Sequence, residues 1–110
     1  MITTGQIKEI LDNYRKFDWV LRRVLLTSDL KARLKDDLET IFADGRIIPS
    51  NIDAVWFSRV GKNDREAWEL RILSENPFAL LETFGKSDDE DQRDAVREEM
   101  QTRMAEFSSK

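Results

Sequence analysis

Residues 55–73 read V-W-F-S-R-V-G-K-N-D-R-E-A-W-E-L-R-I-L, and this stretch decides the fold class. Two runs rich in aromatic, β-branched and aliphatic residues flank the turn-forming residues 61–64. The pattern predicts an antiparallel β-hairpin whose four-residue loop places Val60 opposite Arg65. A lone hairpin is only marginally stable in water, so we expect helices to pack on it.

The loop length sets which side chains share a face of the predicted hairpin. Phe57 is expected opposite Trp68 and Val55 opposite Leu70, whereas a different turn would exchange the two faces. One face is predicted to be apolar, with Val55, Phe57, Trp68, Leu70 and Ile72. The other face is mixed, with Trp56, Ser58, Val60, Ala67, Glu69 and Arg71. Residues 46–48 offer a short third strand.

The first helix is predicted to begin at Thr3, which forms a capping box with Gln6. Apolar residues then recur at steps of three and four as far as Val24, which is the period of a helix. The pattern leaves two alternatives open. Either one helix continues to about Thr27, or a break occurs near Asp18.

Residues 18–26 carry apolar side chains on several sides, Trp19 among them. A helix of this kind is usually buried on several sides, so we predict a core helix or one shared with a second subunit. A second helix is expected to begin at residues 27–29, where threonine and serine favour an N-cap. It is expected to end at Gly45, a residue type that favours a helix C-cap.

Two more helices are predicted after the hairpin. The Asn-Pro pair at residues 76 and 77 is typical of a helix start, and residues 77–84 are largely apolar. Residues 87–90 fit a second capping box, and the last helix is expected to reach about Phe107. Its narrow apolar stripe comprises Val96, Met100, Met104 and Phe107.

The predicted fold class is therefore α+β, with one domain over residues 1–110. It consists of two N-terminal helices, a central antiparallel hairpin, and two C-terminal helices that pack on the hairpin. The chain contains no cysteine and no histidine, which excludes disulfide frameworks, thiol nucleophiles, His-based triads and zinc sites built on these residues. With no long apolar run and no leader pattern, we expect a cytoplasmic protein.

The sequence contains no motif that selects a chemistry. Its four glycines are too far apart for a nucleotide-binding loop. The acidic residues 87–91 lack the spacing and the glycine of a calcium loop, so we expect no metal and no other cofactor. A formal net charge of −4 disfavours nucleic-acid binding. No pair of carboxylates near the hairpin is singled out by its spacing as an acid–base pair.

The mixed hairpin face and the last helix supply the candidate interaction residues. Tryptophan with arginine is typical of an interface hot spot, and Trp56 and Arg71 are close enough in the predicted register for a cation–π pair. The alternative is that the last helix covers this face, so that Trp56 is an ordinary core residue. The candidates are Trp19, Trp56, Ser58, Glu69, Arg71, Met100 and Met104.

We expect a small non-catalytic interaction domain that binds a protein partner or forms a homodimer. Residues 1–35 hold eight basic and four acidic side chains, a net of +4. Residues 36–110 hold ten basic and eighteen acidic side chains, a net of −8. Opposite charges of this kind attract within one fold or between two copies.

Two other functions remain open at this point. One is a small-ligand binder or a carboxylate–arginine enzyme, with a pocket between hairpin and helices that uses Arg59, Arg71 and either Glu66 or Glu69. The other is an antitoxin-like or immunity-like inhibitor whose acidic C-terminal half meets a basic partner. No membrane partner is expected.

Overall fold

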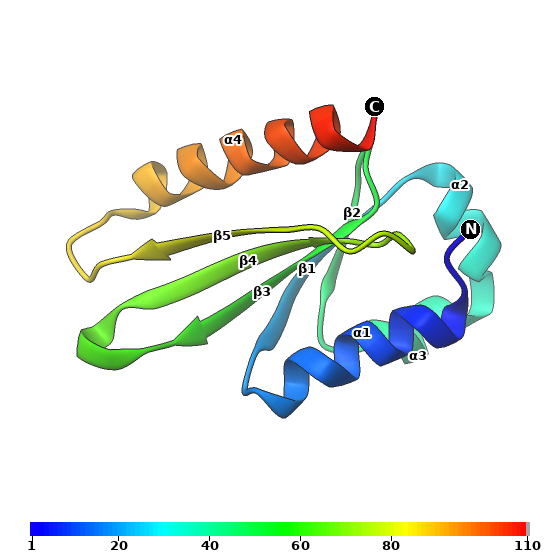
Figure 1. Cartoon of the computed structure of the whole chain (residues 1–110), viewed down its shortest axis with the longest axis horizontal. Helices are drawn as coiled ribbons and strands as arrows, with labels where there is room; N and C mark the ends of the chain where they lie inside the picture. The colour runs from blue at the N-terminus through cyan, green and yellow to red at the C-terminus, as the bar shows by residue number, and fades with distance from the viewer. Residues whose placement is uncertain (110) are drawn as a thin grey trace.

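The computed structural model describes residues 1–109, which form an α+β fold around one mixed sheet (Figure 1). Within these residues five strands lie in the order β2-β1-β3-β4-β5. β1 and β2 run parallel, and the other neighbours run antiparallel. The elements are α1 (Thr4–Lys16), β1 (Val20–Leu26), α2 (Ser28–Leu34), the 3-10 turn η1 (Lys35–Asp37), α3 (Leu38–Ile41), β2 (Arg46–Pro49), β3 (Ala54–Val60), the 3-10 turn η2 (Lys62–Asp64), β4 (Glu66–Ile72), β5 (Ala79–Phe84) and α4 (Glu90–Ser108).

Helices cover both faces of the sheet, but they cover them unequally (Figure 1). On one face, called the α1 face, α1, α2 and α3 bury side chains of β1 and β3, such as Val24 and Phe57. On the other, called the α4 face, α4 buries side chains of β3, β4 and β5, such as Trp56, Leu70 and Phe84. Among the described residues, no buried side chain of β4 or β5 belongs to the α1-face core. On the α1 face the helices therefore leave β5 uncovered, and β4 contributes no fully buried side chain.

The predicted helix over residues 18–26 is wrong, because residues 20–26 form strand β1. Of the two alternatives for the first helix, the break near Asp18 is observed: α1 ends at Lys16, and Asp18 has a φ of 66°. β1 lies between two other strands and is covered on both faces. A strand buried on both faces is apolar on both, a pattern that resembles a helix buried on several sides.

The predicted helix over residues 77–84 is also wrong, because Ala79–Phe84 is strand β5. Its side chains alternate between faces: Leu80 and Phe84 pack in the α4-face core, while Leu81 points to the α1 face and is exposed. The Asn-Pro pair at residues 76 and 77 lies in the β4–β5 connection rather than at a helix start.

The predicted hairpin exists, but its register is shifted by one residue. Val60 pairs with Glu66 rather than Arg65, because the loop contains η2, in which Asn63 and Asp64 both have positive φ. Both faces of the hairpin need apolar residues, since helices cover β3 on both sides. The predicted register was chosen so that one face would be apolar and the other mixed, and this assumption was wrong.

The remaining helix predictions hold in part. The capping box of Thr3 and Gln6 is confirmed, and the last helix is confirmed with its capping box at Asp89 rather than at residues 87–90. The second helix is broken at Lys35, where φ is 37°, and α3 ends before Gly45. A Cβ at Gly45 would lie 2.8 Å from the Val24 side chain, so the glycine permits close packing on β1.

The predicted third strand is confirmed as β2, although it pairs with β1 rather than with the hairpin. The α+β class is therefore correct. The predicted order of two N-terminal helices, one hairpin and two C-terminal helices is wrong, because residues 1–109 contain a five-stranded sheet.

Candidate functional site

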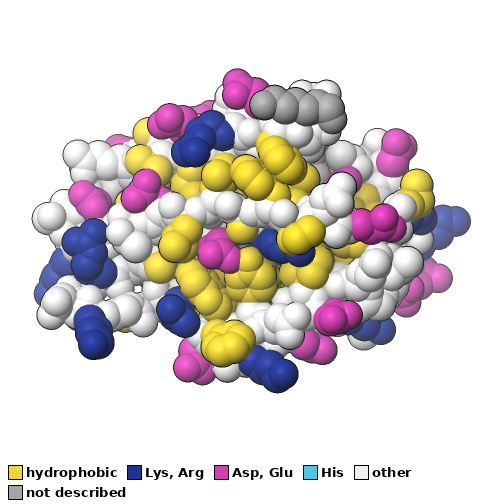
Figure 2. Space-filling model, in the orientation of Figure 1, with side chains coloured by type: hydrophobic (Ala, Val, Ile, Leu, Met, Phe, Trp, Pro, Cys, Tyr) yellow, Lys and Arg dark blue, Asp and Glu magenta, His cyan; other side chains and the backbone are white. Residues whose placement is uncertain are grey.

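The free side of β5 is the most accessible backbone surface of the sheet. β5 pairs with β4 along one side, and its other side has no strand partner within residues 1–109. The strand is six residues long and carries one charged side chain, Glu82. Figure 2 shows hydrophobic side chains across the middle of the molecule, between α4 and α1, with acidic and basic side chains among them.

Sheet geometry determines which backbone groups of β5 face outward. The N–H of Ile72 donates to the C=O of Phe78 at 3.0 Å, and the same register continues along both strands. Hydrogen-bonded positions alternate in an antiparallel pair, so even-numbered residues of β5 bond to β4. The odd-numbered residues Ala79, Leu81 and Thr83 direct their N–H and C=O groups to the free side. We call these three residues the β5 edge.

Side chains at the β5 edge leave most of it accessible. Leu81 is 58% exposed on the α1 face. The carboxylate of Glu82 accepts a hydrogen bond from the N–H of Thr83 at 3.1 Å, which agrees with the outward direction of that N–H. The backbone groups of Ala79 and Leu81 have no such side-chain partner among the described residues.

One flank of α4 rises above the β5 edge. Asp94 and Gln101 contact Arg23 and Trp56, so they mark the flank of α4 that faces β1. By the helical repeat, the opposite flank carries Gln92, Val96, Glu99 and Arg103. Neither of the two charged residues on this second flank forms an ion pair with another described residue.

A partly buried polar contact joins α1 to β4 on the α1 face. The hydroxyl of Tyr14 donates to the carboxylate of Glu69, and its ring stacks on Phe57 at a centroid distance of 4.0 Å. Burial, followed by the hydrogen bond and the negative charge of Glu69, raises the pKa of Tyr14 well above its ordinary value, and Arg71 opposes this shift. The contact anchors α1 beside the open part of the sheet.

An aromatic hollow of about 310 Å³ lies at the C-terminal end of α1. This aromatic hollow is lined by Asn13, Tyr14, Phe17, Trp19 and Arg59. Tyr14 and Trp19 meet edge to face at 6.0 Å, and the Arg59 guanidinium lies 4.8 Å from the Trp19 ring centre. Phe17 is 65% exposed. The hollow thus combines three aromatic walls with a single guanidinium.

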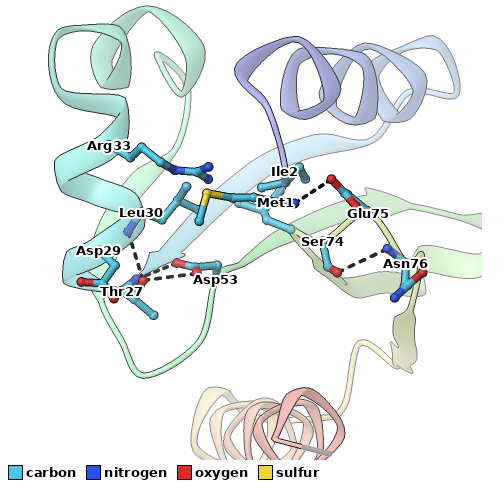
Figure 3. Close-up of a pocket in the computed structure, with 11 residues that line it drawn as sticks. Met1, Ile2, Thr27, Asp29, Leu30, Arg33, Asp53, Ser74, Glu75 and Asn76 are labelled. Carbon is cyan, nitrogen blue, oxygen red and sulfur yellow. Dashed lines mark hydrogen bonds and ion pairs between the residues drawn. The ribbon is translucent and has the colours of Figure 1, made fainter.

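A larger polar cleft of about 470 Å³ lies at the opposite end of the sheet (Figure 3). Asp53 accepts hydrogen bonds from the N–H and the hydroxyl of Thr27, at 2.7 and 3.2 Å, so its carboxylate serves the start of α2. Arg33 extends from α2 toward the cleft, which Glu75 lines on the far side. The cleft therefore mixes acidic and basic groups, and Asp53 has a structural role.

A buried arginine lies between α4 and the sheet. Arg97 is 2% exposed; its guanidinium carbon lies 4.2 Å from the Trp68 ring centre, and its Nη1 pairs with Glu90 at 2.8 Å and Asp94 at 2.5 Å. Burial, and next the positive charge of Arg97, lower the pKa of the neighbouring Arg23. Two carboxylates thus compensate this pair of cations within the chain.

The structure distributes the predicted interaction residues over both faces of the sheet. Four of them are buried on the α4 face: Trp56, Ser58, Met100 and Met104. The other three are half-buried on the α1 face: Trp19, Glu69 and Arg71. The proposed pair of Trp56 with Arg71 is not formed, because these residues point to opposite faces. α4 covers Trp56, and Gln101 accepts a hydrogen bond from its indole N–H at 2.9 Å.

Sequence reasoning missed the residues that form the β5 edge. The helix predicted over residues 77–84 does not distinguish the two faces of a strand, so Leu81 was not recognised as an exposed edge residue. The available signal was the alternation of Phe78, Leu80 and Phe84, which a strand explains with Glu82 as the exception. Phe17 was missed as a surface residue because its spacing from the apolar residues of α1 is that of a buried helix face.

The described residues include no group of three or more Asp or Glu side chains placed to hold a metal ion. No helix in residues 1–109 combines the length and apolar character needed to cross a membrane.

Comparison with family models, curated proteins and solved structures finds no match to this chain. The chemistry of its own surfaces is therefore the basis for the functional argument.

Proposed function

We propose that this protein is an interaction domain, acting by binding rather than catalysis, that forms a symmetric homodimer through the β5 edge. Two copies would join their sheets edge to edge, with β5 of each copy antiparallel to β5 of the other. Symmetric dimers of this type are the commonest closed assemblies, because one self-complementary surface serves both partners. The observation that carries the proposal is the free side of β5, with Leu81 exposed at its centre.

Geometry selects one register for this pairing. Residues opposite each other in an antiparallel pair share a face, so odd-numbered residues must pair with odd-numbered ones. With Leu81 on the two-fold axis, Leu81 pairs with its own copy and Ala79 pairs with Thr83 of the second copy. All three outward residues then exchange both backbone hydrogen bonds, with the N–H of Thr83 leaving Glu82 to bond to the second copy. A shift of the axis by one residue leaves one of the three without a partner inside β5.

Side chains support the same arrangement. On the α1 face, Leu81 would contact Leu81 of the second copy and lose its exposure to water. On the α4 face, the two α4 helices would run antiparallel above the axis, with Glu99 and Arg103 on the flanks that face each other. Glu99 of one copy would then approach Arg103 of the other. Exposed pairs of this kind contribute little affinity, but they favour one orientation.

Light scattering coupled to size exclusion tests the dimer directly. We expect a mass near twice 12.9 kDa that falls toward the monomer on dilution. Leu81→Lys should give a monomer, because it places like charges on the axis. Val60→Lys is the matched control, since Val60 is 70% exposed but lies outside the β5 edge, and it should remain dimeric. A wild-type protein that is monomeric at millimolar concentration contradicts the proposal.

Cysteine cross-linking tests the register, because the natural chain contains no cysteine. Opposed residues of a hydrogen-bonded pair have Cα atoms about 5.5 Å apart, within the range that a disulfide spans. Leu81→Cys should therefore form a covalent dimer readily. Thr83→Cys should not, because the two copies of that residue would lie about 13 Å apart along the strands. Equal cross-linking of the two variants contradicts this register.

A further inference from the structure

The aromatic hollow has the composition of a binding site for a small molecule. It lies within one chain, at the junction of α1 with the start of β1 and the end of β3, and it is separate from the β5 edge. Its volume of about 310 Å³ is at the small end of the range for ligand pockets. Predominantly apolar walls with few polar groups are typical of such pockets.

The walls of the aromatic hollow favour a flat ring. Tyr14 and Trp19 are half-buried and hold each other at an interplanar angle of 74°, and Tyr14 is fixed from behind by its stack on Phe57. Phe17 stands at the rim and is 65% exposed. A ring placed between these side chains would remove aromatic surface from water on several sides, in offset or edge-to-face contact.

The polar groups of the aromatic hollow favour an anion. Arg59 donates through Nη1 to the C=O of Phe17 at 2.9 Å and lies over Trp19, which holds its guanidinium at the wall. Its Nη2 and Nε have no acceptor among the described residues. The side-chain amide of Asn13, which also lines the hollow, likewise donates to no described residue. A guanidinium fork of this kind matches the two oxygens of a carboxylate.

Charge distinguishes the aromatic hollow from the other concave regions. Asp29, Asp53 and Glu75 line the polar cleft of Figure 3, and Asp94 and Glu98 line the groove beside Arg97. No acidic side chain lines the aromatic hollow in the described part of the chain. Its guanidinium is therefore not neutralised locally, as it would be by a carboxylate of its own.

The geometry points to the aromatic hollow as a binding site for a small aromatic carboxylate. The ring occupies the space between Phe17 and Trp19, and the carboxylate accepts hydrogen bonds from Arg59, with the amide of Asn13 as an additional donor. This inference stands apart from the proposed dimer, since a monomeric variant keeps the complete hollow.

The test uses phenylacetate as the probe and phenylacetamide as its neutral counterpart, with ¹H–¹⁵N spectra of the full chain as the readout. We expect phenylacetate to shift the Trp19 indole and Asn13 side-chain signals with a Kd below about 1 mM. The amide should bind at least tenfold more weakly, because it lacks the charge that Arg59 recognises. Shifts scattered over the surface, or equal binding of the two compounds, overturn the inference.

Variants separate the roles of charge and ring. Arg59→Gln should reduce phenylacetate binding to the level of the amide, whereas Arg33→Gln, the same change at a distant exposed site, should have no effect. Phe17→Ala should weaken both compounds severalfold, and its exposed position leaves the core intact. Leu81→Lys should bind phenylacetate as the wild type does, so a failed dimer and a failed ligand site are distinguishable. Unchanged affinity in both Arg59→Gln and Phe17→Ala overturns the assignment.

Discussion

The two edges of the sheet differ in how they are protected. β2 has four residues, pairs in parallel with β1, and carries the charged Arg46 at one end and Pro49, which lacks an N–H, at the other. β5 has six residues, contains no proline, and exposes Leu81 at its centre. Short strands, charges and prolines are the common means by which proteins prevent edge pairing.

This difference shows that each edge strand is protected by its own residues, and that a weakly protected edge indicates a binding surface. The same chain protects β2 in several ways, whereas at β5 it uses only Glu82, which occupies the N–H of Thr83. An edge left open in this way risks unspecific aggregation unless it has a partner. A second copy in the register centred on Leu81 satisfies the outward groups of β5 and removes that risk.

The largest effect is expected from a pair of prolines inside β5. Leu80→Pro removes an N–H that bonds to β4, and it should lower the free energy of unfolding by about 3 kcal/mol. Leu81→Pro removes an N–H that points to the free side, so the monomer should keep nearly all its stability while the dimer is lost. Chemical denaturation and light scattering measure the two outcomes. If both prolines destabilise equally, the assignment of inward and outward residues is wrong.

A smaller effect is expected where α1 is anchored beside the open strands. Tyr14→Phe removes the hydrogen bond to Glu69 and should cost about 1 kcal/mol at neutral pH. Because the pKa of Tyr14 is raised in the folded state, its contribution is present below about pH 10, the ordinary value, and is lost as pH rises above it. The wild type should therefore lose more stability than Tyr14→Phe between pH 10 and pH 12. Parallel pH profiles in denaturant titrations would show that Tyr14 does not anchor α1 in this way.

The smallest effect concerns the one charge that protects β5. Glu82→Gln keeps a side-chain oxygen that can accept from the N–H of Thr83, but it removes the repulsion between the two copies of residue 82. At a diagonal separation of about 7 Å, two exposed charges repel by about 0.5 kcal/mol, so the dimer Kd should fall two- to threefold. Sedimentation equilibrium measures this change, and weaker association of Glu82→Gln would show that the carboxylate assists pairing instead of opposing it.

Local signals in the sequence were sufficient for some elements. The hairpin of β3 and β4 was predicted because two strand-forming runs flank a recognisable turn, and α1 and α4 were predicted from capping residues and helical period. The register was missed because Asn63 and Asp64 adopt positive φ and lengthen the loop by one residue. That choice depends on the conformation of two residues, which composition does not determine.

Other elements depend on contacts that a linear pattern does not contain. β1 is a strand because it lies between β2 and β3, and its apolar residues on either side of Arg22 and Arg23 fit a buried helix equally well. β5 is a strand because β4 offers it a partner. The shifted register placed Trp56 and Arg71 on one face, whereas the alternative that the last helix covers Trp56 is the one observed. Because β5 was taken for a helix, the exposed edge at Leu81 was not predicted.

The strand order also has a consequence for how the chain reaches its native state. β3, β4 and β5 follow one another along the sequence and pair as neighbours, so short loops are enough to assemble them. β1 must instead pair with β3 across a long segment, as Val24 does with Val55, and it must also bind β2 in parallel. Because closing long loops slows folding, we expect the meander to form first and the docking of β1 to limit the folding rate.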